Sequence, residues 1–479
     1  MLTYSFADIG SDTLYNHLYK CIKNDILSGN LDAGSRLPSK RSLAKNLGIS
    51  VITVETAYAQ LVAEGYIYAL PKKGFFVADI RRTQEQQNAL LSSENVRLSS
   101  GETTYIADFS SNQTDRENFP FSIWTKLVRE ILNENQKELV TNPPCGGILK
   151  LRRAIADHLK GYRNLHIEPE QIIVGAGTEY LYGLLIQLLG FDKKYAVEDP
   201  GYDKIYKIYT RHQVTCNHIP MDESGIIIEE LEKHHTDIVH ISPSHHFPTG
   251  IIMPIGRRYE LLGWASKSPD RYIIEDDYDS EFRMTGQPIP ALQDIDVLER
   301  VIYINTFTKT LSSTVRISYM VLPKPLVNRF YKELSFYSCT VSNFEQYTLA
   351  RFIEDGYFEK HLNRMRNYYH SKRDYLLGCI KESSFSSHVE IMEEDAGLHF
   401  IMKIDTALND RDFCMFAEQK GIRLTALSHY YSLPTDVEHY FVINYSSVQE
   451  DRIEEAIRIL YEIARKHNTP FSSKNAAPF

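Results

Sequence analysis

From about residue 106 onward, the sequence alternates short apolar strands with helical stretches. Each strand ends on glycine or polar residues, as in the segments QIIVGAGTEYLYGLLIQLL, KYAVEDPGY, DIVHISPSHHFPTG and RYIIEDDYDSEF. This alternation predicts an α/β fold in which helices cover both faces of a mostly parallel sheet. Ligands of such sheets bind beyond the carboxyl ends of the strands, so we expect the polar strand ends to converge on one site.

Length and composition limit what the rest of the molecule can be. The chain has 479 residues, more than one hydrophobic core usually serves, so two or more domains are expected. No apolar run approaches the length of a membrane helix, and the N-terminus lacks the basic flank and apolar core of a secretory signal. The six cysteines have no CxxC spacing, which is typical of inert thiols in a reducing compartment. We therefore expect a cytoplasmic protein without membrane contact.

The N-terminal segment has the spacing of three short helices. Apolar side chains recur at helical intervals between residues 11 and 29. Ser39 is expected to cap a helix that runs through Leu47, and Ser50 to cap the next helix after a tight turn at Gly48. Two short helices joined by a glycine turn predict a helix-turn-helix.

A small hairpin is expected after the helix pair. Two brief apolar strands, residues 66–68 and 74–77, flank a proline and two lysines. Residues 34–73 carry six basic and two acidic side chains, although the whole chain has a net charge of −9. This order is typical of a winged helix-turn-helix, whose second helix enters the major groove of DNA while the wing contacts phosphates. The alternatives are a generic three-helix module and a solvated charged face.

This N-terminal segment resembles the DNA-binding domain of the GntR regulators over roughly residues 12–80. The shared pattern stands here as LPSKRSLA, ITVETAY, AEGY and KKGFFV. One departure is Val51, which follows Ser50 where such proteins commonly carry an arginine. The resemblance implies binding to double-stranded promoter DNA. Its candidate contact residues are Lys40, Arg41, Ser50, Thr53, Lys72 and Lys73.

The strand ends of the second part carry unusual polar groups. The turn 176–178, Ala-Gly-Thr, opens a helix, where free backbone N–H groups and a hydroxyl favour a phosphate. Three consecutive carboxylates, Glu275 to Asp277, require a positive charge nearby, which a metal, a lysine or a protonated ring nitrogen can supply. A metal is not favoured, because the adjacent His245 and His246 point differently on an extended chain.

Lys309 follows another apolar strand, residues 301–304. A lysine in a partly desolvated pocket loses its proton more easily and becomes a nucleophile for an aldehyde. The phosphate loop, the carboxylates and this lysine together suit one ligand, the phosphorylated pyridine aldehyde pyridoxal phosphate. The alternative, a surface lysine at the mouth of a loop, leaves the carboxylates and the phosphate loop unexplained.

Residues 106–465 resemble a fold-type I pyridoxal phosphate-dependent aminotransferase, with a mostly parallel large domain and a small α+β domain. The shared motifs include PPCGGILKLRRAIADHL, EDPGY, NTFTKTLSSTVRISY and DAGLHF. The resemblance implies that Lys309 forms a Schiff base with the cofactor, that Asp276 pairs with the ring nitrogen and that Tyr278 meets the ring hydroxyl. The other residues placed around the cofactor are Ala176, Gly177, Thr178, Tyr202, His246, Thr306, Thr308 and Arg316.

The arginine with which aminotransferases clamp a substrate carboxylate is missing. Ser447 stands in its place, and a serine cannot replace a two-pronged guanidinium contact. Either Lys204, Arg423 or another cation takes that role, or the effector is not a simple amino acid. The second option resembles certain members of the MocR group of bacterial transcriptional regulators, which sense pyridoxal phosphate itself and control vitamin B6 synthesis.

An aminotransferase-like domain behind a GntR module resembles the MocR group of bacterial transcriptional regulators. The main hypothesis is therefore a regulator that senses pyridoxal phosphate or a small amine or amino acid as its effector. The alternatives are an active aminotransferase with an appended DNA-binding domain and a plain DNA-binding structural protein. The MocR resemblance also implies a head-to-tail, domain-swapped homodimer. The expected domains are the DNA-binding domain 1–80, a linker 81–105, the effector domain 106–465 and a loose tail 466–479.

Overall fold

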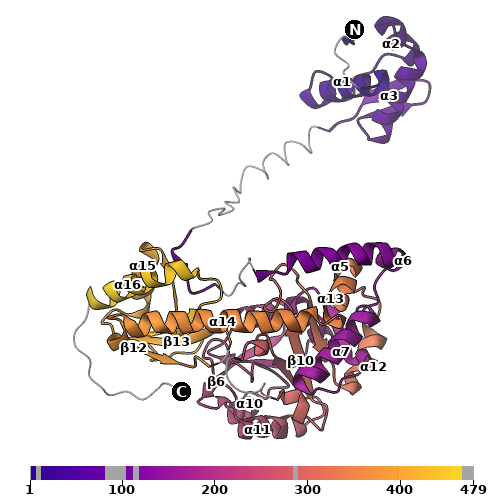
Figure 1. Cartoon of the computed structure of the whole chain (residues 1–479). Helices are drawn as coiled ribbons and strands as arrows, with labels where there is room; N and C mark the ends of the chain where they lie inside the picture. The colour runs from indigo at the N-terminus through magenta and orange to yellow at the C-terminus, as the bar shows by residue number, and fades with distance from the viewer. Residues whose placement is uncertain are drawn as a thin grey trace. The chain divides into compact units, whose positions relative to one another are not determined.

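The computed structural model describes residues 2–6, 12–80, 104–111, 118–283, 290–395 and 397–466 of the chain. It contains two compact units, Met1–Glu102 and Thr103–Phe479, here called the N-terminal and the C-terminal unit (Figure 1). Most of the predicted linker and most of the predicted tail lie outside the described residues. None of the described helices is long and apolar enough to cross a membrane.

The N-terminal unit contains the helices and the hairpin that the sequence predicts. Its elements are α1 (Leu14–Ser28), α2 (Lys40–Leu47), α3 (Val51–Ala63), β1 (Ile67–Leu70) and β2 (Gly74–Val77). The Ser39 hydroxyl accepts a hydrogen bond from the Ser42 N–H at the start of α2, and the Ser50 hydroxyl accepts one from the Thr53 N–H at the start of α3. Gly48 ends α2 with a φ of 68°, which glycine adopts without strain. The predicted helix-turn-helix and its caps are therefore confirmed.

An apolar core holds the N-terminal unit together. Leu18 and Ile22 of α1 belong to one buried cluster with Val54, Tyr58 and Leu61 of α3. These positions of α3 recur at intervals of three and four residues, so they occupy one face of the helix. The opposite face of α3 is exposed to solvent.

The C-terminal unit is built on an eight-stranded sheet. Its strands are β4 (Ile172–Gly175), β5 (Lys194–Asp199), β6 (Thr215–Asp222), β7 (Gly225–Ile226), β8 (Ile238–Ile241), β9 (Tyr272–Asp276), β10 (Val301–Thr306) and β11 (Ser318–Val321). Their order across the sheet is β4-β11-β10-β9-β8-β5-β6-β7. The five strands from β10 to β6 run parallel, whereas β11 and β7 are antiparallel to their neighbours. The predicted mostly parallel sheet is therefore confirmed.

Helices cover both faces of this sheet. They are α5 (Phe121–Glu134), α6 (Gln136–Leu139), α7 (Leu149–Arg163), α8 (Thr178–Leu189), α9 (Asp203–Arg211), α10 (Ile228–Lys233), α11 (Ile255–Ser266), α12 (Lys324–Glu333) and α13 (Asn343–Glu354). Strand β10 shows how the faces divide, because Tyr303 packs in one buried cluster with residues of α7 and α13. Ile302 and Ile304 point the other way and pack in a second cluster with residues of α8.

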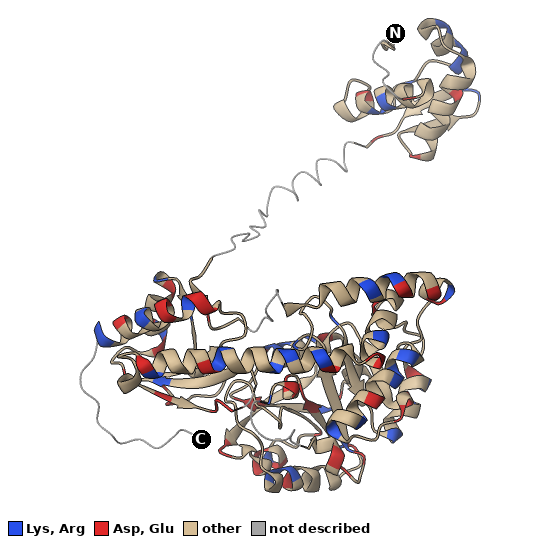
Figure 2. Ribbon diagram, viewed as in Figure 1, with Lys and Arg blue, Asp and Glu red and all other residues tan. Residues whose placement is uncertain are grey.

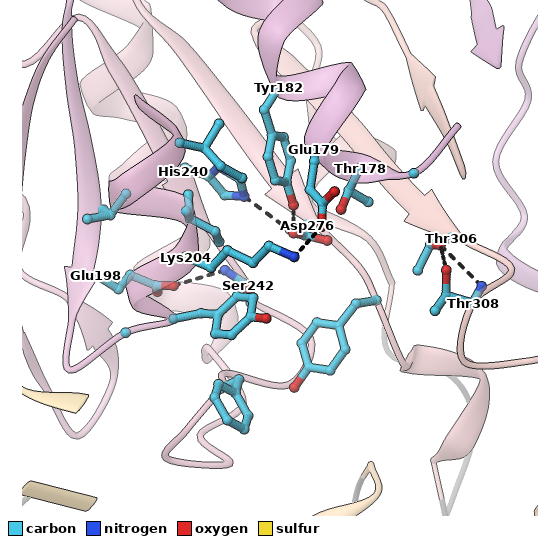
Figure 3. Close-up of a pocket in the computed structure, with 18 of the residues that line it drawn as sticks. Thr178, Glu179, Tyr182, Glu198, Lys204, His240, Ser242, Asp276, Thr306 and Thr308 are labelled. Carbon is cyan, nitrogen blue, oxygen red and sulfur yellow. Dashed lines mark hydrogen bonds and ion pairs between the residues drawn. The ribbon is translucent and has the colours of Figure 1, made fainter. Parts of the chain in front are cut away.

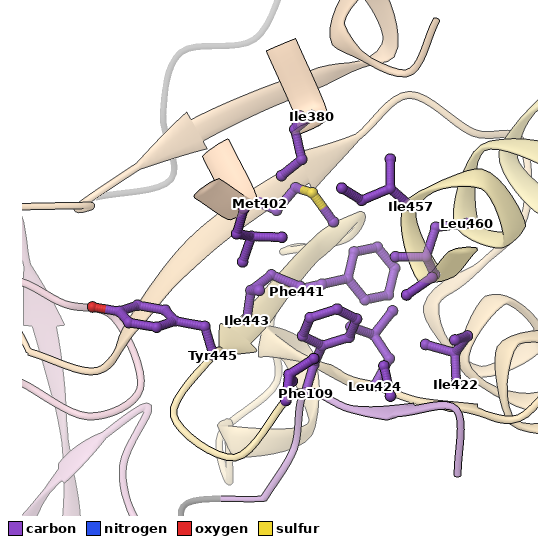
Figure 4. Packing of buried hydrophobic residues seen from close by; sticks show 14 of the residues in the cluster. Phe109, Ile380, Met402, Ile422, Leu424, Phe441, Ile443, Tyr445, Ile457 and Leu460 are labelled. Atoms are coloured by element: carbon purple, nitrogen blue, oxygen red, sulfur yellow. The ribbon is translucent and has the colours of Figure 1, made fainter. Parts of the chain in front are cut away.

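A smaller domain of the C-terminal unit contains an antiparallel sheet in the order β12-β13-β16-β15. The elements of this domain are β3 (Ala107–Asp108), β12 (Val389–Met392), β13 (His399–Ile404), β14 (Ile422–Arg423), β15 (Thr425–Ala426), β16 (Tyr440–Asn444), α15 (Asp410–Gln419) and α16 (Glu450–Lys466). β14 pairs in parallel with β3. In the core of this domain, Phe109 near β3 and Phe441 of β16 lie against Ile457 and Leu460 of α16 (Figure 4).

One long helix, α14 (Tyr357–Glu382), belongs to both cores of the C-terminal unit. Its first turns contribute Phe358 and Leu362 to the cluster beside the large sheet. Further along, Met365, Leu376 and Ile380 belong to the core of the smaller domain. Figure 1 shows this helix in orange, running lengthwise along the unit. The two domains are therefore joined by a continuous helix as well as by loops.

Candidate functional site

A cavity of about 270 Å³ opens at the carboxyl ends of β4, β5, β8, β9 and β10 (Figure 3). The predicted site residues that line it are Gly177, Thr178, Tyr202, Lys204, His246, Asp276, Tyr278, Thr306, Thr308, Lys309 and Arg316. The sequence thus predicted correctly that the polar strand ends converge. They do so because neighbouring parallel strands end at the same edge of the sheet.

Asp276 is the carboxylate of β9 that faces the cavity. Its Oδ2 accepts a hydrogen bond of 2.5 Å from the Tyr182 hydroxyl and lies 3.4 Å from Nε2 of His240 (Figure 3). Its Oδ1 is buried and has no hydrogen-bond partner in the described structure. One oxygen of Asp276 is therefore fixed by the protein, while the other can accept a hydrogen bond from a bound ligand.

The other two carboxylates of the triplet serve the fold. Glu275 accepts hydrogen bonds from the backbone N–H groups of Leu292 and Gln293, at 2.7 and 3.0 Å. Asp277 forms a buried ion pair with Arg163 and accepts a hydrogen bond from the Tyr303 hydroxyl at 2.6 Å. The side chains alternate along the extended chain, so only the middle carboxylate reaches the ligand side.

The end of the cavity at which the sequence predicts a phosphate lies at the start of α8. Gly177 caps this helix with a φ of 93°, and a Cβ at that position would lie 2.4 Å from the Arg316 guanidinium. Glycine therefore lets the Arg316 guanidinium approach the start of the helix, where the cation and the free backbone N–H groups can together face an anion. On the opposite side, the Thr306 hydroxyl donates to the Thr308 hydroxyl at 2.8 Å and accepts from the Thr308 N–H at 3.1 Å.

Glu179 brings together the two cations at this end. One of its oxygens pairs with the Lys204 ammonium, and the other lies 3.0 Å from the Arg316 guanidinium. These two cations lower the pKa of the Glu179 carboxyl, with Lys204 as the stronger cause. Lys204 and Arg316 are thus both held at this end of the cavity by the Glu179 carboxylate.

Lys309 is almost completely buried, with 8% of its surface exposed. Burial lowers the pKa of its ammonium to about 8, while the nearby Asp279 carboxylate opposes that shift. A larger share of the amine is therefore neutral near physiological pH than for an exposed lysine, and the neutral amine is the nucleophilic form.

A second acidic group, Glu198, lies on the far wall of the cavity. Its Oε2 accepts a hydrogen bond of 3.0 Å from the Ser242 N–H and lies 3.4 Å from Nε2 of His246. Burial raises the pKa of Glu198 to about 8 and lowers the pKa of His246 to about 3. Near neutral pH this wall therefore offers a neutral imidazole and a carboxyl that is largely protonated.

Beside Lys309, imidazole and aromatic rings form the next layer of the wall. Nδ1 of His245 lies 2.8 Å from the Asp279 carboxylate and 3.3 Å from the Tyr278 hydroxyl. The ring of His399 packs against His245 at 4.6 Å and against Phe247 at 5.2 Å, measured between centroids. The ligand atoms of His245, Asp279 and His399 lie within 4.8 Å of one another, so among the described residues this is a group that could hold a metal ion.

Three of the predicted site residues do not line the cavity. The Ala176 N–H donates to the Thr340 hydroxyl at 2.9 Å. Arg423 is 54% exposed and lies 3.5 Å from the Asp108 carboxylate, across the β14–β3 pair. The Ser447 hydroxyl donates to the Ser111 carbonyl at 3.5 Å.

Some residues that line the cavity were not predicted from the sequence, among them Glu179, Tyr182, Glu198 and His240. For two of them the sequence contains a pattern that places them near the site. Tyr182 follows Thr178 by one helical turn and so shares its face of α8, while His240 lies near the end of a strand. Glu179 and Glu198 gave none, because a single acidic residue is usually a solvated one.

The DNA-facing candidates lie on the surface of the N-terminal unit. Arg41, Lys72 and Lys73 are exposed, and the ribbon in Figure 2 is blue, for lysine and arginine, along part of α2. Ser50 and Thr53 form the capped start of α3, where their hydroxyls lie 2.8 Å apart. The sixth candidate, Lys40, pairs with Glu55 of α3 at 2.6 Å. Exposed cations beside a capped second helix are the arrangement that a winged helix-turn-helix uses to contact DNA.

Known protein families match both units of the chain. Residues 14–77 match the model of the bacterial regulatory proteins of the gntR family, and residues 104–460 match that of aminotransferase class I and II. The chain is also similar to two solved aminotransferases. They are the kynurenine aminotransferase of Pyrococcus horikoshii (TM-score 0.65, 22% identity, 80% of this chain and 94% of that one) and the multiple substrate aminotransferase of Thermococcus profundus (TM-score 0.67, 24% identity, 76% and 92%).

Whole-length relatives combine the same two parts. The HTH-type transcriptional regulator YdeL of Bacillus subtilis is 38% identical over 93% of this chain and 96% of its own length. The probable rhizopine catabolism regulatory protein MocR of Rhizobium meliloti is 30% identical over 93% of both chains. The pyridoxine biosynthesis regulator PdxR of Corynebacterium glutamicum is 29% identical over 90% of this chain and 92% of its own.

The fold and these relatives define a DNA-binding transcriptional regulator whose second unit has an aminotransferase fold. The predicted combination is thereby confirmed, and the regulator is supported over the active aminotransferase with an appended DNA-binding domain. The chain belongs to the GntR-type HTH regulators of the MocR kind. The aminotransferase fold family indicates pyridoxal phosphate as the cofactor, as predicted.

The residues of the cavity fit this cofactor. The unpartnered Oδ1 of Asp276 is suited to a protonated ring nitrogen, and the start of α8 at Gly177 and Thr178, together with the Arg316 guanidinium, is suited to a phosphate. Lys309 supplies a buried amine with a lowered pKa for the aldehyde. The ring, the phosphate and the aldehyde thus each have a group in the cavity of matching chemistry.

Proposed function

We propose that the chain is a regulator that senses pyridoxal phosphate through Lys309 and changes its binding to promoter DNA when the cavity is filled. The observation that carries this proposal is the buried Lys309 amine in the same cavity as the unpartnered Oδ1 of Asp276, in a chain that also carries a GntR-type DNA-binding unit. When bound, the cofactor supplies an aldehyde that reacts with an amine. The chain's own residues bind it, orient it and exclude water from it.

Each group of the cavity has a distinct role in this proposal. Asp276, oriented by Tyr182 and His240, accepts a hydrogen bond from the protonated ring nitrogen, while Tyr278 lies at the ring hydroxyl. Around the phosphate lie Gly177, Thr178, Thr306, Thr308 and Arg316. Tyr202 covers the ring from the solvent side, since half of its surface is exposed at the cavity.

Pyridoxal phosphate itself is the effector that this cavity favours. Among the described residues that line it, the cations are Lys204, Lys309 and Arg316. Lys204 and Arg316 converge on Glu179 at the phosphate end, and Lys309 takes the aldehyde. A substrate carboxylate would therefore meet no further cation of this chain in the cavity, so efficient amino-acid transamination is not expected.

Promoter recognition by this family suggests that the molecule acts as a homodimer in the cytoplasm. A winged helix-turn-helix contacts one half-site of DNA, and two copies double the contact and set the spacing of the half-sites. We propose the head-to-tail, domain-swapped arrangement that the resemblance to the MocR regulators implies. Light scattering of the purified protein, which measures mass independently of shape, tests the dimer.

The central test uses a labelled DNA fragment from upstream of the chain's own gene. Fluorescence anisotropy is expected to show binding whose affinity or stoichiometry changes when pyridoxal phosphate is added. Lys309→Ala should keep the DNA binding and lose the response to pyridoxal phosphate. Lys372→Ala is a poor control because Lys372 is buried, whereas Lys381→Ala changes an exposed lysine of α14 and should leave both properties intact. An equal response to the cofactor in the wild type and in Lys309→Ala would refute the proposal.

A further inference from the structure

The second helix of the helix-turn-helix, α3, carries no basic residue. Its sequence is VITVETAYAQLVA, and Glu55 is its one charged side chain. Guanine is most often recognised by a bidentate arginine or lysine on its O6 and N7 atoms, and α3 offers neither. Base recognition by this helix must therefore use other side chains.

The first turn of α3 instead exposes two β-branched apolar side chains. Ile52 is 74% exposed and Val51 is 41% exposed, although Val54, Ala57 and Tyr58 of the same helix are buried. The helix is anchored beneath them, because the Ser50 hydroxyl caps it through the Thr53 N–H. The first residues of the second helix are the ones that contact base edges in a helix-turn-helix. An apolar surface of two residues therefore lies where bases are read.

Two polar side chains of the first turns of α3, Glu55 and Thr56, already have partners within the protein. The Glu55 carboxylate pairs with Lys40 at 2.6 Å, and the Thr56 hydroxyl donates to the Ile52 carbonyl at 3.0 Å. The cations lie outside α3, in α2 and in the wing, where Arg41, Lys72 and Lys73 are exposed. This division suits a DNA surface whose phosphates are contacted by the flanking cations and whose central groove contact is apolar.

The apolar group that a base presents in the major groove is the 5-methyl of thymine. We propose that Ile52, together with Val51, selects operator sequence by contacting thymine methyl groups. The proposal rests on DNA binding by the N-terminal unit and names the base feature that this unit recognises. Each contacted methyl buries a small apolar area against Ile52, so its removal should weaken binding about three- to fivefold.

The test begins with the full-length protein and a pool of DNA duplexes with a random central segment. Repeated selection is expected to enrich a site with thymine at fixed positions. Each of these thymines is then replaced singly by uracil, which lacks only the 5-methyl. Wild-type protein should bind the uracil duplex about three- to fivefold more weakly at one or two positions, and Ile52→Ala should bind both duplexes equally. Val62→Ala, which shortens an exposed apolar side chain at the far end of α3, should keep the wild-type ratio.

The outcomes separate this proposal from the proposed function. If no sequence is enriched, sequence-specific DNA binding by the N-terminal unit is refuted, and the proposed function with it. If a site is enriched but uracil binds as well as thymine at every position, or if Ile52→Ala keeps the discrimination, only the thymine contact is refuted. Because Ile52 is exposed and alanine favours helix, loss of folding does not explain an effect of Ile52→Ala.

Discussion

The two units of the molecule differ in where their charged groups lie. In the described part of the N-terminal unit, the buried side chains are hydrophobic or aromatic, and the cations are on the surface. The C-terminal unit buries Arg163, Glu275, Asp277 and Lys309. Stability and function are therefore carried by different residues in the N-terminal unit, whereas in the C-terminal unit they share the same buried polar interior. Substitutions in each unit can test this difference by measuring stability and binding separately.

The largest effect is expected from Arg163→Met in the C-terminal unit. The Arg163 guanidinium pairs with Asp277, and both side chains are almost fully buried. Methionine would leave the Asp277 carboxylate without its counter-ion, which should lower the free energy of unfolding by about 3–5 kcal/mol. Urea denaturation followed by circular dichroism measures this change.

The control for this change is Arg329→Met, which breaks the surface pair between Arg329 and Glu333, one helical turn apart. Its expected cost is below about 0.5 kcal/mol. Equal costs for the two substitutions would mean that burial does not strengthen the pair, and the contrast between the units would fail.

The next effect is the pH dependence of cofactor capture. With a pKa of about 8, roughly one tenth of the Lys309 amine is neutral at pH 7, against about one part in three thousand for an ordinary lysine. Because only the neutral amine reacts, the rate of capture should rise roughly tenfold per pH unit up to about pH 8 and then level off. Stopped-flow absorbance of the bound cofactor measures the rate. A small-molecule lysine analogue is the reference, and its rate should continue to rise above that pH.

Asp276→Asn should weaken pyridoxal phosphate binding by about 10- to 100-fold, because it removes a charge-assisted hydrogen bond to the ring nitrogen. Equilibrium titration of the visible absorbance of the bound cofactor measures the affinity. Asp203→Asn, on the exposed side of α9 where Asp203 pairs with Lys207, is the matched control and should bind like the wild type. A wild-type affinity for Asp276→Asn would remove this residue from the site.

The smallest effect is expected on the surface of the N-terminal unit. Arg41→Ala should reduce the slope of log affinity against log salt concentration by about one. It should leave the free energy of unfolding unchanged. Lys23→Ala is the control, since Lys23 already pairs with Glu64 at 3.3 Å. A loss of stability in Arg41→Ala would show that stability and DNA contact are not separate in this unit.

Much of the fold could be predicted because its signals are local. The serine caps, the glycine turn and the apolar periodicity predicted the helix-turn-helix. The strands that end on polar residues predicted that the site lies at the carboxyl ends of the sheet strands. The triplet 275–277 illustrates the limit of such signals. The sequence shows three adjacent carboxylates, yet only the alternation of side chains along β9 decides that Asp276 faces the cavity.

The contacts that were not predicted join side chains that are far apart in the sequence. Glu179 opens α8, Lys204 lies on α9 and Arg316 precedes β11, so their meeting depends on side-chain reach across three elements. The cluster of His245, Asp279 and His399 likewise joins the two domains of the C-terminal unit. No periodicity in the sequence encodes such contacts, because each partner has its own local environment along the chain.

Helix α14 has a consequence for how the C-terminal unit melts. Its side chains belong to the cores of both domains, so neither domain can lose its packing without fraying a helix that the other requires. The C-terminal unit is therefore expected to unfold as one cooperative block. In a calorimetric scan, the large and small domains should share a single endotherm.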